Sequence, residues 1–160
     1  MLFRSFLSLN GPFLGKFLVP LLPQLEALFY NRDNIENEIK EKLLAGALVE
    51  INPGVLDQLL LAIKRGELVS AKGDFSYRKN LGKIETPLLL IGGEADKLAP
   101  PEAIEIVRRE VGSRDRTVRI FGPKAKDSVA YGHIDLILGP KAKQEVFPAI
   151  VRWLKQKGGD

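Results

Sequence analysis

Residues 86–96 read TPLLLIGGEAD, and this stretch decides the fold. Its four consecutive large aliphatic residues, Leu88 to Ile91, lack polar alternation and predict a strand buried on both faces, as in a parallel sheet. Gly92-Gly93 ends the strand, and Asp96 follows in an acidic loop just past the carboxyl end. In open α/β sheets, ligands and catalytic groups collect at that edge.

The residues after this stretch predict a strand–helix–strand unit. Glu102–Val111 carries its apolar residues on one helical stripe, and Thr117–Phe121 is β-branched and aromatic, as strands are. A crossover of this length makes the two strands parallel. A last helix follows Gly139-Pro140, and Pro148 within it is expected to kink or split it.

The first half of the chain is predicted to be helical. One helix covers residues 33–47 with Asp33 as its cap, and a second covers Pro53–Arg65 between a cap at Asn52 and a stop at Gly66. The second helix has an apolar stripe, made by Val55, Leu56, Leu59, Leu60 and Ile63. We therefore divide the chain into a helical cap or lid region, residues 1–83, and an α/β segment, residues 84–160.

Composition excludes several classes of protein. The 160 residues are 45% hydrophobic, enough for one domain with a core. There is no cysteine, which rules out disulfides, thiol nucleophiles and thiolate metal sites. The net charge is +4, but the basic residues are scattered, so we expect no nucleic-acid partner.

The opening thirty residues are rich in phenylalanine but do not predict a membrane segment. Asn10-Gly11-Pro12, Lys16 and two prolines interrupt every apolar run well short of the length that spans a bilayer. No small-residue cleavage site follows, so we expect a cytoplasmic protein without a transmembrane span. This segment either packs into a core or forms a lid that lines an apolar pocket or touches lipid.

Two positions are candidates for catalysis. Asp96 follows one strand, and His133, the single histidine, follows the next in the sequence Tyr131-Gly132-His133-Ile134-Asp135. Neighbouring parallel strands bring both residues to one edge, where an aspartate can accept the Nδ1 proton and stabilise an imidazolium. Gly132 is expected to let the backbone turn the ring outward, and Asp135 to hold the loop by backbone hydrogen bonds.

These segments together resemble the α/β-hydrolase family. Residues 86–96 are similar to its P-hydrophobic-I-x-G-x-x-D strand, residues 98–101 to the D-x-x-x-P continuation, and residues 131–136 to its G-H loop. Residues 145–154 are similar to the closing helix of esterases and lipases. The resemblance implies the C-terminal portion of an α/β-hydrolase fold, preceded by a helical cap. It also makes Asp96 the acid and His133 the histidine of a catalytic triad.

The nucleophile of such a triad is missing. No G-x-S-x-G or HGGG-like pattern occurs, and none of the serines has the flanking glycines that the elbow requires: Ser5, Ser8, Ser70, Ser76, Ser113 and Ser128. The chain thus resembles the back half of a hydrolase. If a serine had been overlooked, Ser128 in the loop before His133 would be the first candidate.

Three interpretations remain open at this stage. In the first, the chain is the C-terminal part of a carboxylic ester hydrolase or acyltransferase. In the second, it is a non-catalytic descendant of that family that serves as a binding or assembly module. In the third, Glu94, Asp96, His133 and Asp135 act otherwise, for instance around a metal, although the sequence has no recognised metal-ligand spacing. We favour the first and assign no cofactor and no metal.

The expected partners follow from the first interpretation. An apolar cap favours an apolar acyl substrate. The strand at Leu88–Ile91 has no lysine, internal proline or bulge to protect an edge, so a chain without its other half should pair with that N-terminal half or form a homo-oligomer.

Overall fold

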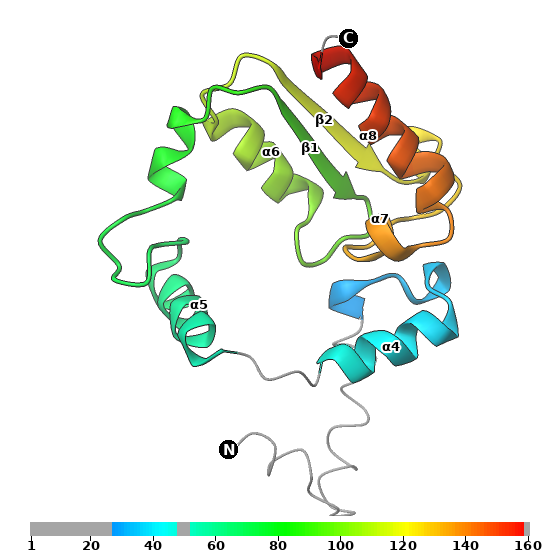
Figure 1. Ribbon diagram of the computed structural model, residues 1–160, viewed down its shortest axis with the longest axis horizontal. Coiled ribbons are helices and arrows are strands. Elements are labelled where there is room, and N and C mark those ends of the chain that lie inside the picture. The colour runs from blue at the N-terminus through cyan, green and yellow to red at the C-terminus, as the bar shows by residue number, and fades with distance from the viewer. Residues whose placement is uncertain (1–26, 48–51, 159–160) are drawn as a thin grey trace, which may run out of the picture.

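The computed structural model describes residues 27–47 and 52–158, and its centre is a pair of parallel strands between two helices (Figure 1). Strand β1, Leu88–Gly93, pairs in parallel with β2, Arg116–Phe121, in a register that runs from Leu88↔Arg116 to Gly93↔Phe121. Helix α6, Pro101–Glu110, makes the crossover between them. The parallel strand pair flanked by helices is therefore as predicted.

The two helices cover opposite faces of the strand pair. Gly92 of β1 faces Ile104 of α6, whereas Ile91 packs against the buried cluster that includes Val146 of α8, Ala142–Gly158. The prediction that β1 is buried on both faces is only partly right, because Leu88 to Ile91 are half-buried. The described residues supply β1 with one neighbouring strand, so its other edge is not covered by the sheet.

The core lies on the α8 side of the sheet and supports the ends of both strands. It consists of buried side chains from β2, the loop after it, α7 (Asp135–Leu138) and α8: Phe121, Tyr131, Leu136, Ala142 and Val146. The rings of Phe121 and Tyr131 meet edge to face with centroids 5.9 Å apart, a favourable geometry for aromatic pairs. Tyr131 thus anchors the histidine loop to the core.

Helix α8 runs unbroken through Pro148, so the expected split is wrong. The proline removes one hydrogen bond, to the carbonyl of Gln144, and both residues are exposed, so water can satisfy that carbonyl. Val146 and Ile150 hold the two halves of the helix against the same core. Packing on both sides of the proline outweighs the local cost.

The N-terminal helices differ from the sequence prediction at one boundary. Helix α4 begins at Asn37 and ends at Ala47, and the expected cap Asp33 lies instead in a short 3-10 helix, η1, Arg32–Asn34. The side chain of Asn31 caps η1 by accepting from the Asp33 N–H at 3.4 Å. Tertiary hydrogen bonds of Asn31 and Asn34, described below, account for this early turn.

Helix α5, Pro53–Arg65, matches the prediction at both ends. Asn52 Oδ1 accepts from the Gly54 N–H at 2.8 Å, and Gly66 closes the helix in the left-handed region with φ 68°. Its apolar stripe is exposed in the structure, from 44% at Leu56 to 69% at Ile63. No helix among the described residues is both long and apolar enough to cross a membrane.

The segment between α5 and β1 is held by hydrogen bonds to α5 and within itself. A β-bridge joins Val69 to Ser76, and Gln58 of α5 donates to the Val69 carbonyl at 2.9 Å. A 3-10 helix, η2, Arg78–Lys83, then leads to β1, while a second short turn, η3, Pro123–Ala125, interrupts the loop after β2.

Candidate functional site

Asp96 is fixed by the loop that carries it. Its carboxylate oxygen Oδ1 accepts hydrogen bonds from the backbone N–H groups of Leu98 and Ala99, both at 2.8 Å. Such a local turn is typical of an aspartate that starts a loop before a helix. The side chain is buried, and the turn leaves its second oxygen, Oδ2, available to another partner.

That partner is His133. Its Nδ1 lies 2.9 Å from Asp96 Oδ2, which confirms the predicted contact between the two residues at the carboxyl edge of the strand pair. Because a carboxylate oxygen only accepts hydrogen bonds, this contact assigns the proton to Nδ1 and, in the neutral ring, the lone pair to Nε2. The Asp96 side chain is 1% exposed and the His133 side chain 42% exposed, so the ring presents a base to solvent while its acid partner is buried.

The two loops meet because β1 ends in glycine. The Ala95 N–H donates to the Tyr131 carbonyl at 2.8 Å, so the histidine loop crosses over the end of β1. A Cβ atom at Gly93 would lie 2.2 Å from that carbonyl oxygen. Only glycine therefore allows the approach that brings His133 above Asp96.

Asp135 holds the histidine loop, as predicted. Its carboxylate is completely buried, and Oδ2 accepts from the Gly132 N–H and from Asn34 Nδ2, each at 2.8 Å. The ring faces outward as expected, but Gly132 does not adopt the left-handed φ that would by itself require glycine. The residue must instead be small, since a Cβ there would lie 2.7 Å from the backbone nitrogen of Asn31.

Two residues of the site were not predicted from sequence. Asn31 and Asn34 lie about a hundred positions before His133, yet their side-chain amides both donate to the Ala130 carbonyl, at 2.8 and 2.6 Å. The sequence signal was a pair of asparagines in a short polar stretch, which by itself indicates only a turn. Their partners are set by tertiary contacts that no local pattern encodes.

The set of metal ligands in the third interpretation does not assemble. Glu94 pairs with Lys124, whose Nζ lies 3.1 Å from Glu94 Oε1. Hydrogen bonds from the Lys124 backbone and side chain hold the pKa of Glu94 below its ordinary value. Asp135 is saturated by N–H donors, and the described part of the chain holds no group of three or more acidic or histidine side chains placed to bind a metal ion. The four side chains therefore do not form a single ligand set in this structure.

Ser128 does not contact the histidine. Its backbone N–H donates to Glu145 at 2.9 Å, and the Tyr131 hydroxyl donates to the same carboxylate at 2.7 Å. Burial opposes ionisation of Glu145, but hydrogen bonds from Ser128 and Tyr131 outweigh it and hold the pKa of Glu145 below its ordinary value. Among the described residues, no serine hydroxyl is hydrogen-bonded to His133.

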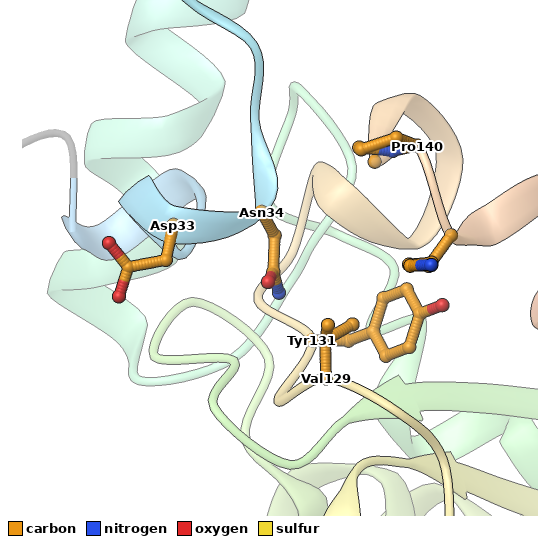
Figure 2. Close-up of a pocket in the computed structure, with 7 residues that line it drawn as sticks. Asp33, Asn34, Val129, Tyr131 and Pro140 are labelled. Atoms are coloured by element: carbon orange, nitrogen blue, oxygen red, sulfur yellow. The ribbon is translucent and has the colours of Figure 1, made fainter.

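A small cavity lies beside the histidine loop, and Figure 2 shows the residues that line it. Its volume is about 110 Å³, and it opens between η1 and the turn before α8. Its lining combines η1, loop and turn residues: Asp33, Asn34, Val129, Tyr131, Gly139, Pro140 and Lys141. Neither Asp96 nor His133 reaches it, and it is smaller than pockets that bury organic ligands, so we do not assign it to the substrate.

The chemistry of the site is that of an acid–base pair with an open position. A buried carboxylate orients an imidazole whose Nε2 has no hydrogen-bond partner among the described residues. No protein-family model matches the chain, and neither the curated proteins nor the solved structures contain a significant match.

Proposed function

We propose that this chain supplies the acid and the histidine of a serine-type carboxylic ester hydrolase or acyltransferase, and that the nucleophile comes from a polypeptide segment outside this sequence. The observation that carries the proposal is the 2.9 Å contact between His133 Nδ1 and the buried carboxylate of Asp96. Both residues follow parallel strands, where catalytic groups of α/β sheets collect. The motif resemblance around each residue points to the same chemistry.

In this mechanism His133 Nε2 takes the proton of the attacking hydroxyl as a general base and then returns it to the leaving group as a general acid. Asp96 remains ionised, keeps the proton on Nδ1 and stabilises the imidazolium. The described residues contribute neither a serine at Nε2 nor a recognisable oxyanion hole. Both must come with the completing segment, which the proposal requires to lie close to the end of β1.

The open edge of β1 offers a place for that segment. Leu88 donates its N–H to Asp115 and Glu94 donates to Phe121, so the even-numbered residues of β1 face β2. The backbone groups of Leu89 and Ile91 alternate to the other side, where the described residues provide no partner. An N-terminal half that pairs there would complete the sheet, and in its absence a homo-oligomer would use the same edge.

We propose an apolar acyl group as the substrate class. Its support is the apolar composition of residues 1–83 and the exposed stripe of α5. The same exposed stripe supports a second candidate, a non-catalytic binding or assembly module, because solvent-exposed apolar helix faces mark contacts with other molecules. The cytoplasm is the compartment we propose for either function.

Reconstitution separates the two candidates. The 160-residue chain should be expressed alone and together with a polypeptide that contains G-x-S-x-G and is encoded upstream of the Met1 codon, and tested on p-nitrophenyl butyrate. We expect no saturable turnover from the chain alone, because the imidazole has no serine to activate. The pair should hydrolyse the ester, and His133→Gln should abolish this, whereas Asp33→Ala, outside the pair, should not.

Two results would contradict the hydrolase proposal. One is saturable turnover by the chain alone that a serine-directed phosphonate abolishes, since that would reveal a nucleophile within this sequence. The other is the absence of any G-x-S-x-G from the upstream DNA. That second result favours the binding module.

A further inference from the structure

A short N-terminal segment clamps the histidine loop from outside the strand–helix–strand unit. We call residues Phe29–Asn34 the strap; it is drawn in blue next to α7 in Figure 1. The Phe29 carbonyl accepts from the Ile134 N–H at 2.8 Å, directly after His133 in the chain. The side-chain amides of Asn31 and Asn34 donate to the Ala130 carbonyl, three residues before His133. The strap therefore holds the loop on both sides of the catalytic ring.

The two members of the catalytic pair are held differently. Asp96 is fixed within its own loop by the N–H groups of Leu98 and Ala99. His133 ends a connection that starts at Gly122 after β2, and the backbone on either side of its ring is bonded to the strap. Loosening the strap should thus displace the histidine and leave the aspartate in place.

The contact with the strap is specific in shape and in hydrogen bonding. The strap backbone passes so close to Gly132 that a Cβ there would lie 3.0 Å from the Tyr30 carbonyl carbon. Asn34 Nδ2 donates both to the Ala130 carbonyl and to buried Asp135 Oδ2, at 2.6 and 2.8 Å. Reversing that amide would place its oxygen against two acceptors, so its orientation is fixed.

We propose that the strap is the positioning element of His133: through Asn31 and Asn34 it fixes the ring so that Nδ1 meets Asp96 and Nε2 stays open. The catalytic meaning of this role rests on the proposed function, but the positioning itself does not. The strap joins the loop to α4. Any change in the N-terminal helical region that shifts residues 29–34 would therefore move the His133 ring relative to Asp96. Asn34 and Asn31 are positioning residues, since neither contacts His133 Nε2.

The single histidine makes the test direct. The full 160-residue chain labelled with ¹⁵N-histidine gives one imidazole pattern in a long-range proton–nitrogen NMR experiment, at a pH where the ring is neutral. The wild-type chain should show the Nδ1–H tautomer with a slowly exchanging proton. Asn34→Ala should lose that proton signal and give an averaged tautomer pattern. Asp33→Ala, on the same turn but without a bond to the loop, is the matched control and should keep the wild-type pattern.

Folding and positioning are separated by a second probe and a second variant. Fluorescence of Trp153, the single tryptophan, reports on the packing of α8. The N34A chain must show the same Trp153 emission as the wild type. If N34A does not fold, Asn31→Ala decides, because it keeps the bond between Asn34 and Asp135. This variant removes the bond to Ala130 and also the cap of η1, so it too must retain the Trp153 signal. A folded N34A or N31A chain with the wild-type tautomer pattern would overturn the proposal. The readout needs no turnover, so a failed reconstitution would leave it unaffected.

Discussion

Each carboxylate oxygen of Asp96 has its own hydrogen-bond partners: Oδ1 accepts from two backbone N–H groups, and Oδ2 lies 2.9 Å from Nδ1 of His133. The carboxylate can only accept, so it determines which ring nitrogen carries the proton. The fixed Oδ1 also determines how any isosteric replacement of this residue must be oriented. This gives the site an unusually sharp mutational test.

Asp96→Asn should reverse the tautomer of His133. The carbonyl oxygen of the new amide must take the place of Oδ1, because the N–H groups of Leu98 and Ala99 need an acceptor. Its NH₂ group then faces His133 and donates to Nδ1, which moves the ring proton to Nε2 and removes the base on which the proposed mechanism depends. The ¹⁵N imidazole shifts of the single histidine measure this exchange of tautomers.

Glu94→Gln is the matched control for that variant. Glu94 lies two residues earlier in the same loop but pairs with Lys124. The substitution should therefore leave the His133 pattern as in the wild type. A D96N chain that keeps the Nδ1–H tautomer would show that Asp96 does not set the proton position.

The open edge of β1 predicts how the chain assembles in the absence of a completing segment. The N–H of Leu89 faces away from β2, whereas the N–H of Leu90 faces it. We expect the wild-type chain to be a dimer or larger at micromolar concentration, since an unpaired backbone group in an apolar setting costs about 1–3 kcal/mol. Leu89→Pro removes only the outward N–H and should yield a folded monomer by sedimentation velocity.

Leu90→Pro is the matched substitution on the inward side. It removes a hydrogen-bond donor of the β1–β2 ladder and should unfold the sheet rather than change its assembly. A wild-type chain that sediments as a stable monomer would contradict the role of the edge. So would an L89P chain that assembles like the wild type.

The sequence predicted the strand–helix–strand unit because its signals are local. The unbroken aliphatic run of β1, the stripe of α6 and the caps of α5 each act within a few residues, and each element formed within two residues of its predicted ends. The Asp96–His133 contact was also predictable, since parallel pairing brings both strand ends to one edge. The motif resemblance and the parallel strand topology both pointed to Asp96 and His133.

The strap was not predictable, for a physical reason. Asp33 followed by Glu36 is a good local helix start, but the structure uses Asn31 and Asn34 to satisfy buried Asp135 and the Ala130 carbonyl. A buried carboxylate without donors is far more costly than a shortened helix, so the tertiary demand determines the boundary. Gly132 was likewise not explained by its local sequence, because glycine is required there by the neighbouring strap and not by its own backbone angles.

The core prediction compares two phenylalanines of different burial. Phe121 is 1% exposed and packs beneath the histidine loop, whereas Phe147 of α8 is 40% exposed. Phe121→Ala should lower the free energy of unfolding by about 3–5 kcal/mol through lost burial and a cavity, and Phe147→Ala, whose ring is only partly buried, by about 1–2 kcal/mol. Urea unfolding followed by Trp153 fluorescence measures both, and equal losses would show that the loop does not rest on this core.

Acid should weaken the fold in part through Glu145. Its pKa is held below its ordinary value in the folded state, so it stabilises the fold above that ordinary value and loses the contribution as the pH falls through the lowered one. Tyr131→Phe removes one of the two donors and should cost about 1 kcal/mol at pH 7, at the low end for a charged hydrogen bond because Glu145 is partly exposed to water. As the pH falls through the lowered pKa of Glu145 and the carboxyl group becomes protonated, the gap between wild type and Y131F should shrink. A gap that stays constant from pH 7 to pH 3 would mean that the Tyr131 hydroxyl stabilises the loop without any dependence on the charge of Glu145.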